Sequence, residues 1–164
     1  MNVPAATVRL LVCGSADRGD DCAALFAAAH VLPGLEAAVR QKLEVRRCER
    51  LDATDLIDVA EGEACIVLDT VVGIEPGSIL ECPLEELADR SAASPRSSHP
   101  LPIDQVLGIA EAVRGALPRG TFVGIGGKWF GYGEVRSRAL RAGMSDFEAA
   151  LEHAIRSLAG VPVG

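Results

Sequence analysis

The sequence predicts an α/β fold of three layers, with helices on both faces of a mostly parallel, twisted sheet of about five strands. Several short apolar runs lack polar alternation, which is typical of parallel strands buried on both faces. Segments with apolar residues three and four positions apart separate these runs, as helices do in α/β proteins. The 164 residues suffice for a proper core, and we expect residues 1–164 to form a single domain.

Charge and composition exclude several classes of protein. The net charge is −7 and no basic stripe is visible, so we expect neither nucleic acid nor an anionic membrane as a partner. No segment has the length of a membrane span, and residues 1–7 do not resemble a secretion signal, so we expect a cytoplasmic protein. Five cysteines without a C-x-x-C pair favour reduced, mostly structural thiols. The sequence does not indicate an oligomeric state.

The first half of the chain alternates strands and helices. Residues 8–13 form a continuous apolar run and predict a central parallel strand. A helix follows Asp20-Asp21 and is interrupted near its end by Pro33-Gly34. Further elements are expected as a strand over 43–47 with an exposed face, a short helix from Asp52 or Thr54 through Val59, and a strand over 64–68.

The second half continues this pattern after a turn at Pro76-Gly77-Ser78, which leads into a short edge strand at Ile79 and Leu80. Residues 91–102 are rich in Ser and Pro and predict a loop. One apolar face then predicts a helix from Ile103 to Leu117, ended by Pro118 and Gly120, and residues 121–125 predict a strand. The last helix is predicted to begin at Ser145-Asp146-Phe147-Glu148, which matches a capping box.

Three short polar signals fall where a predicted strand ends or a helix begins: Asp20-Asp21, Asp69 and Ser98-His99. The carboxyl ends of parallel strands meet at one edge of a sheet, where such folds bind ligands. Two carboxylates and an imidazole that converge there suit a divalent metal ion. Each signal has a structural alternative.

Helix capping is the favoured interpretation for one member of the acidic pair, and because one cap needs only one acid, the other is free to contact a ligand. Asp69 fits an Asx-type turn bonded to the backbone of Val71 or Val72 about as well as a ligand in a cleft. His99, taken alone, fits an exposed loop residue. The glycine-rich segment 124–133, with Lys128 and three aromatic residues, indicates either a partner-binding loop or a cluster covering the sheet edge, and it matches no phosphate-binding pattern.

Together these segments resemble the hydrogenase maturation protease family, which removes a carboxyl-terminal extension from the large subunit of nickel-iron hydrogenases. The resemblance spans most of the chain and implies a phosphorylase/hydrolase-like fold. It depends on a glycine turn and acidic pair after the first strand, a strand ending in Asp, a Pro-Gly-Ser turn, a Ser-x-His element and a closing Gly-x-Ser before a helix. In this sequence these are Gly14-Ser15 through Asp20-Asp21, Leu68-Asp69, Pro76-Gly77-Ser78, Ser97-Ser98-His99 and Gly143-Met144-Ser145.

The resemblance implies that Asp21, Asp69 and His99 are both the catalytic and the metal-contacting residues. The metal would be nickel carried by the partner, a hydrogenase large-subunit precursor, with no organic cofactor. Cleavage would then follow only after nickel insertion. The sequence departs from the family's pattern at Ser15 in place of Asn, at Cys22 and Ala24 in place of glycines, and over residues 126–142.

Three hypotheses follow from these observations. The first is a nickel-dependent endopeptidase with metal-assisted peptide hydrolysis, in which a carboxylate accepts a proton. The second is a noncatalytic checkpoint or adaptor protein that binds the nickel-loaded large subunit without cutting it. The third is an unrelated doubly wound small-molecule-binding domain, which a crevice with Asp21, Asp69 and His99 far apart would favour.

Overall fold

The computed structural model describes residues 7–89, 96–97, 102–133 and 135–160. Its sheet is mostly parallel, with helices on both faces, and this confirms the predicted fold class. Along the sheet the strand order is β2-β1-β3-β6-β4, and a two-residue strand, β5, also pairs with β3. The strands are β1 Val8–Cys13, β2 Leu43–Cys48, β3 Ala64–Val72, β4 Ile79–Pro83, β5 Arg96–Ser97 and β6 Gly120–Gly126.

Pairing within the sheet is parallel among β2, β1, β3 and β6, whereas β4 and β5 run antiparallel to their neighbours. The central strands are buried along nearly their whole length because helices cover both of their faces. Strand β2 lies at one edge and is half exposed, as predicted. The edge strand β4 was predicted from the turn at Pro76-Gly77-Ser78 and is confirmed.

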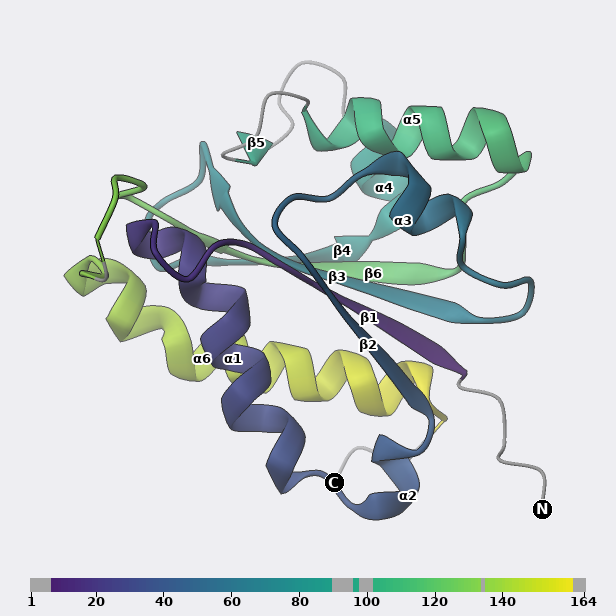
Figure 1. Ribbon diagram of the computed structural model, residues 1–164, viewed down its shortest axis with the longest axis horizontal. Coiled ribbons are helices and arrows are strands. Elements are labelled where there is room, and N and C mark those ends of the chain that lie inside the picture. The colour runs from purple at the N-terminus through teal and green to yellow at the C-terminus, as the bar shows by residue number, and fades with distance from the viewer. Residues whose placement is uncertain (1–6, 90–95, 98–101, 134, 161–164) are drawn as a thin grey trace.

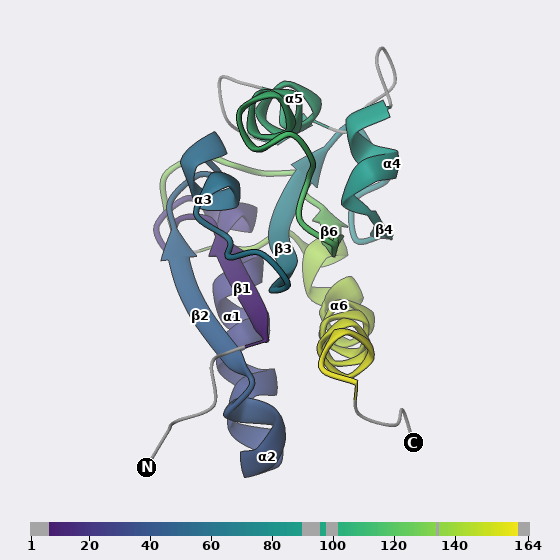
Figure 2. The ribbon, with the colours of Figure 1, turned by 90° about the vertical axis from the view of Figure 1, so that its right-hand side faces the viewer.

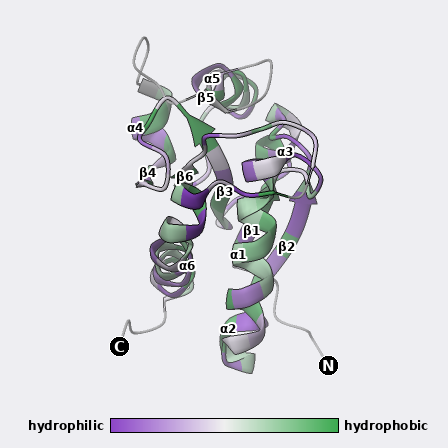
Figure 3. Ribbon diagram, turned by 90° about the vertical axis from the view of Figure 1, so that its left-hand side faces the viewer, coloured by the Kyte–Doolittle hydropathy of each residue, from purple (hydrophilic) through white to green (hydrophobic). Residues whose placement is uncertain are grey.

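The helices form two layers that sandwich the sheet (Figures 1 and 2). On one face lie α1 and α6 together with the short α2; on the other lie α3, α4 and α5. Figure 3 shows that α1 is hydrophobic over most of its length, which fits its contacts with both the sheet and the neighbouring α6. The helices are α1 Ala23–Val31, α2 Ala37–Arg40, α3 Ala53–Ile57, α4 Leu84–Asp89, α5 Ile103–Arg114 and α6 Arg138–Leu158, with 3-10 turns η1 Gly19–Cys22 and η2 Leu32–Gly34.

Strand alternation divides the core into two apolar clusters, one on each face of the sheet. Leu10, Ile66 and Val123 face α1 and α6, whereas Leu11, Val67 and Phe122 face α3, α4 and α5. None of the helices in the described residues has the length and apolar character needed to cross a membrane.

Two predicted helix boundaries are wrong. Helix α5 ends before Gly115, whose φ of 88° is left-handed and whose N–H donates to Glu111, rather than at Pro118 and Gly120. Helix α6 begins at Arg138 instead of Ser145, because Ser137 caps it by accepting a hydrogen bond from Leu140 N–H.

Glycine inside α6 has a packing reason. A Cβ at Gly143 would lie 2.2 Å from the carbonyl oxygen of Gly77, so the helix contacts the β3–β4 turn directly there. The Gly143-Met144-Ser145 motif therefore lies in the second turn of a longer helix. The sequence also did not predict α4, or β5 within the predicted 91–102 loop.

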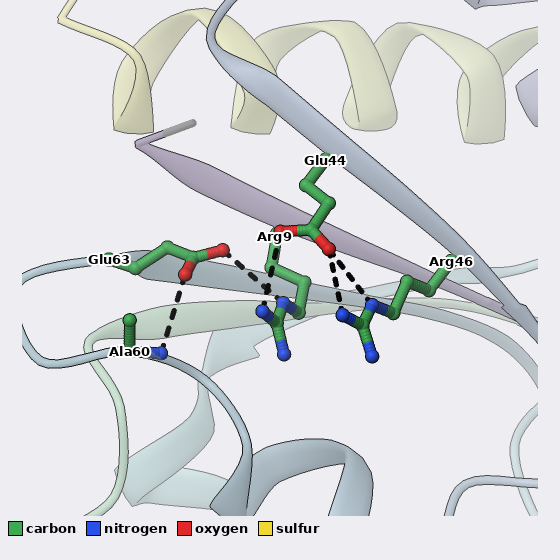
Figure 4. Close-up of polar contacts among 5 residues, drawn as sticks. All are labelled: Arg9, Glu44, Arg46, Ala60 and Glu63. Atoms are coloured by element: carbon green, nitrogen blue, oxygen red, sulfur yellow. Dashed lines mark hydrogen bonds and ion pairs between the residues drawn. The ribbon is translucent and has the colours of Figure 1, made fainter. Parts of the chain in front are cut away.

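At the amino end of the parallel strands, a buried arginine joins three segments (Figure 4). Arg9 in β1 is only 6% exposed. Its Nη2 lies 3.3 Å from Glu44 in β2, and its Nε lies 3.3 Å from Glu63 just before β3. Glu63 also accepts a hydrogen bond from Ala60 N–H, and Arg46 binds Glu44. This charged cluster fixes the end of the sheet opposite to the predicted site.

Two thiols meet at the carboxyl ends of β1 and β2. Cys13 and Cys48 are partners in the strand register, and their Sγ atoms lie 2.9 Å apart. Cys13 is buried, whereas Cys48 is partly exposed. The hydrogen bond to Cys48, together with burial, raises the pKa of the Cys13 thiol well above its ordinary value.

We expect alkylation of the native protein to modify Cys48 alone. The thiolate is the reactive form, and Cys13, Cys22, Cys65 and Cys82 are all buried; burial also raises the pKa of Cys65 to about 12. Peptide mass spectrometry after brief iodoacetamide treatment at neutral pH should find label on Cys48, and all five cysteines should be labelled in denaturant. Equal labelling of Cys65 and Cys48 without denaturant would contradict the described packing.

Candidate functional site

Asp21 lies at the carboxyl end of β1, where the chain turns sharply into η1. The turn depends on Gly14, which has a φ of 137° and lies so close to Asp21 that a Cβ would be 2.1 Å from the Asp21 carbonyl oxygen. After this turn the Ser15 N–H donates to the Asp21 carboxylate over 3.1 Å. Serine at position 15 is thus compatible with the position of the acid, because the contact uses the backbone.

Asp69 lies within β3 and not after it. The strand was predicted to end at Leu68, but it continues to Val72 because β6 pairs with it through Val71. Pairing with β1 stops at Leu68, so Asp69 is the first residue of β3 beyond the last β1 pair. Its side chain is 1% exposed and accepts a hydrogen bond from Thr70 N–H over 2.8 Å. This contact is with the adjacent residue, and the Asx-type turn to Val71 or Val72 stays a prediction.

The two carboxylates are close enough to influence each other's ionisation. Burial, and next the negative charge of Asp21, raise the pKa of Asp69 well above its usual range, while the Thr70 N–H acts in the opposite direction. Asp21 itself is 2% exposed. A buried carboxylate pair of this kind favours a proton or a cation between or beside its members.

Asp20 has a different function from its neighbour. Its carboxylate is fully buried and accepts four hydrogen bonds, from Lys128 N–H, Trp129 N–H, Ser137 N–H and the Ser137 hydroxyl, over 2.7 to 3.1 Å. Burial alone would raise the pKa of Asp20, but these donors outweigh it and lower the pKa below its ordinary value. Capping of the following helix was the favoured interpretation for one acid, and it is wrong for Asp20. This residue instead binds Ser137, the cap of α6.

Backbone hydrogen bonds reinforce this connection between the 14–22 turn and the β6–α6 loop, which lie together at one end of the molecule (Figure 1). Asp20 N–H donates to Trp129, Gly19 N–H donates to Gly133, and Gly133 N–H donates to Asp17, over 2.7 to 2.9 Å. The Thr70 hydroxyl, next to Asp69, donates to the Asp20 carbonyl. The glycine-rich segment is thus joined to the candidate site.

The sequence contains only a weak signal for this role of Asp20. Two adjacent acids exceed what one cap needs, which favoured separate functions for them. The second indication is Ser137, which directly precedes a run of good helix formers and can therefore cap a helix. The capping pattern at Ser145 is stronger, so the sequence predicted the helix start there instead.

Of the three predicted metal-contacting residues, the structure brings Asp21 and Asp69 together, and His99 lies outside the described residues. Within the described ranges, no group of three or more His, Cys, Asp or Glu side chains is placed to hold a metal ion. Strand β5 leads toward the pair: Arg96 is opposite Val72 and Ser97 is opposite Val71, in a direction that approaches Asp69.

The raised pKa of Asp69 predicts a pH-dependent cost to stability. The native state keeps this proton at pH values where the unfolded chain, with an aspartate pKa of about 3.9, has lost it. The contribution of the protonated Asp69 side chain to the free energy of unfolding is therefore present at low pH and is lost as the pH rises through the native pKa. Asp69→Asn should be more stable than the wild type at neutral pH by roughly 1–3 kcal/mol, a usual cost for burying a polar group.

Urea denaturation of both proteins from pH 4 to pH 8 measures this effect. The stability difference should grow as the pH rises, while Asp146→Asn, which alters an exposed residue of α6, should show no such trend. A difference between Asp69→Asn and wild type that stays constant with pH would contradict the assignment.

Comparison with known proteins supports the fold. No protein-family model matches the chain, and no curated protein matches it. Among solved structures, however, the chain has the fold of the hydrogenase maturation proteases, and the resemblance seen in the sequence is confirmed at that level.

Two of these structures are named HybD. The first is the [NiFe] hydrogenase maturation protease HybD from Thermococcus kodakarensis, with 22% identity, a TM-score of 0.62 and coverage of 89% of this chain and 97% of that one. The second is the hydrogenase maturating endopeptidase HybD from E. coli, with 18% identity, a TM-score of 0.70 and 92% coverage of both chains. A third structure, the [NiFe] hydrogenase maturation protease HycI from Thermococcus kodakarensis, has 14% identity, a TM-score of 0.66 and coverage of 93% of this chain and 94% of that one.

Proposed function

We propose that this chain is an endopeptidase that removes the carboxyl-terminal extension of a nickel-iron hydrogenase large-subunit precursor after nickel insertion. The main support is the buried pair Asp21 and Asp69 at the carboxyl edge of the sheet. The fold that holds this pair is shared with solved structures named as such proteases. We place its action in the cytoplasm, as the sequence predicts.

In this proposal, Asp21, Asp69 and His99 contact the nickel ion of the substrate. Two carboxylates that oppose each other's ionisation are stabilised by a divalent cation, and a carboxylate–carboxylate–imidazole set suits nickel. The β5 register supports the inclusion of His99, because the described chain before it approaches Asp69 along β3. The nickel belongs to the precursor, so an empty precursor lacks the group that the site recognises.

The chemistry proposed is hydrolysis by water. Substrate nickel polarises the scissile carbonyl or acidifies the attacking water. Burial and the charge of Asp21 favour the protonated form of Asp69, whereas a divalent cation beside the pair would favour its carboxylate form, which can take a proton from water and return it to the leaving amine. A Cys13 thiolate is an unsuitable nucleophile, because the pKa of that thiol is raised well above its ordinary value.

Incubation of purified precursor with this protein, with and without nickel loading, tests the proposal by mass spectrometry. The expected result is a shortened large subunit and a released peptide only from nickel-loaded precursor. Intact precursor that nevertheless binds the protein would replace the endopeptidase with the adaptor hypothesis. Absence of both cleavage and binding would favour the small-molecule-binding domain, although the proximity of Asp21 and Asp69 argues against it.

A further inference from the structure

We propose that an exposed surface next to the candidate site binds an acidic polypeptide segment of the substrate. The inference rests on the proposed function and adds a recognition surface that the carboxylate pair does not supply. We call it the aromatic–arginine surface. It consists of Arg18, Phe26, Trp129, Tyr132, Val135 and Arg136.

The surface concentrates apolar side chains that a globular protein usually buries. Trp129 is 54% exposed, Tyr132 is 83% exposed and Val135 is 76% exposed. With Gly133, Arg136 and Ser137 they line a hollow of about 380 Å³. Outside this surface, the large exposed apolar side chains of the described residues are Val45, Ile109 and Val113. Clustered aromatic side chains rimmed by polar groups are typical of protein-binding surfaces.

Arginines complete the surface and give it a positive charge. The Arg136 guanidinium lies 4.3 Å from the centre of the Phe26 ring, and that of Arg18 lies 5.5 Å from the centre of the Tyr132 ring. Between residues 127 and 145 the sequence has four basic residues and one acidic residue, although the whole chain carries −7. Attraction therefore favours an acidic partner at this location, and the negative charge elsewhere disfavours an extended polyanion.

The surface is held in place before any partner arrives. The buried Asp20 carboxylate accepts hydrogen bonds from the backbone N–H groups of Lys128, Trp129 and Ser137, which lie in or beside this surface. A Cβ at Gly19 would lie 2.5 Å from the Trp129 carbonyl oxygen, so the two segments are in direct backbone contact. A preorganised surface loses little conformational entropy on binding.

The aromatic–arginine surface lies next to the carboxylate pair. Asp20 is adjacent in sequence to Asp21, and its carbonyl accepts from Thr70, which follows Asp69. A polypeptide bound to Trp129 and Tyr132 is therefore held within reach of the carboxylate pair. Binding energy from this remote contact would orient the scissile peptide there.

Fluorescence anisotropy with two short labelled peptides tests the proposal directly. The first alternates glutamate and leucine around a central phenylalanine; the second has lysine at every glutamate position. The glutamate peptide should bind the wild-type protein, more weakly at high salt, and the lysine peptide should not. The double variant Trp129→Ala with Tyr132→Ala should weaken binding by about tenfold or more, as expected for aromatic anchors. The matched control Ile109→Ala with Val113→Ala alters two exposed residues of α5 and should bind as the wild type does.

Other occupants give distinct results. Equal binding of both peptides, or unchanged binding by the Trp129 and Tyr132 variant, would overturn the proposal. A single-stranded DNA oligomer that binds more tightly than the glutamate peptide would assign the surface to nucleic acid. A dimer that dissociates in the same variant during sedimentation would assign it to a second copy of this chain.

Precursor cleavage separates failure of this inference from failure of the proposed function. If the wild type cleaves nickel-loaded precursor and the double variant does so with unchanged KM, the endopeptidase stands and the surface is not its substrate contact. If the wild type binds the glutamate peptide but cleaves no precursor, the surface stands and the proposed function fails.

Discussion

Asp69→Asn is expected to reduce cleavage of nickel-loaded precursor by about 10²- to 10⁴-fold, the usual effect of losing a general acid or base. Asparagine has nearly the same shape but cannot accept and return the proton. Because the change also removes a buried carboxyl whose native pKa is raised, the variant should be at least as stable as the wild type at neutral pH. Lost activity with retained or improved stability is the signature of a functional residue.

Time courses of precursor processing, followed by mass spectrometry, measure this effect. Asp146→Asn, on the exposed face of α6, serves as control and should cleave at the wild-type rate. Asp21→Asn should also cleave slowly, and it should in addition lower the pKa of Asp69, since the neighbouring negative charge is removed. Normal processing by Asp69→Asn would remove the central claim about the site.

Asp20→Ala should destabilise the protein by about 3 kcal/mol or more, the effect expected when several buried donors lose one shared acceptor. Four donors lose their acceptor, at Lys128, Trp129 and Ser137, and the cap of α6 loses its support. The β6–α6 loop should then become sensitive to trypsin after Lys128 and Arg136. Chemical denaturation and limited trypsin digestion measure the two effects.

Asp17→Ala is the matched control for this second prediction, because Asp17 is an exposed acid of the same turn. It should change stability by less than about 1 kcal/mol, as surface substitutions usually do. A stable Asp20→Ala protein with a trypsin-resistant loop would show that the hydrogen bonds of Asp20 are dispensable.

The regular strands and helices of the fold were predictable because their signals are local. The apolar run at 8–13 and the helix start at Asp52 or Thr54 predicted β1 and α3 with their observed boundaries or close to them. The start of α6 was not predictable in this way. Ser137 and Ser145 are both acceptable caps, and the choice depends on Asp20, more than a hundred residues earlier in the chain.

The candidate site was predictable in part for the same reason. Asp21 and Asp69 follow from the rule that parallel strands bring their carboxyl ends together. Their mutual effect on ionisation depends on burial and on the extension of β3 past β1, which the sequence pattern does not encode. The structural role of Asp20 likewise requires knowledge of which loop packs against η1.

The hydrogen bonds of Asp20 also have a consequence for the order in which the protein takes shape during synthesis. Every donor to its carboxylate comes from residues 128–137, in the last quarter of the chain. A domain generally folds as a unit, so the 14–22 turn cannot complete its contacts before that segment has left the ribosome. The turn that carries Asp21 should therefore reach its final geometry only when translation is almost complete.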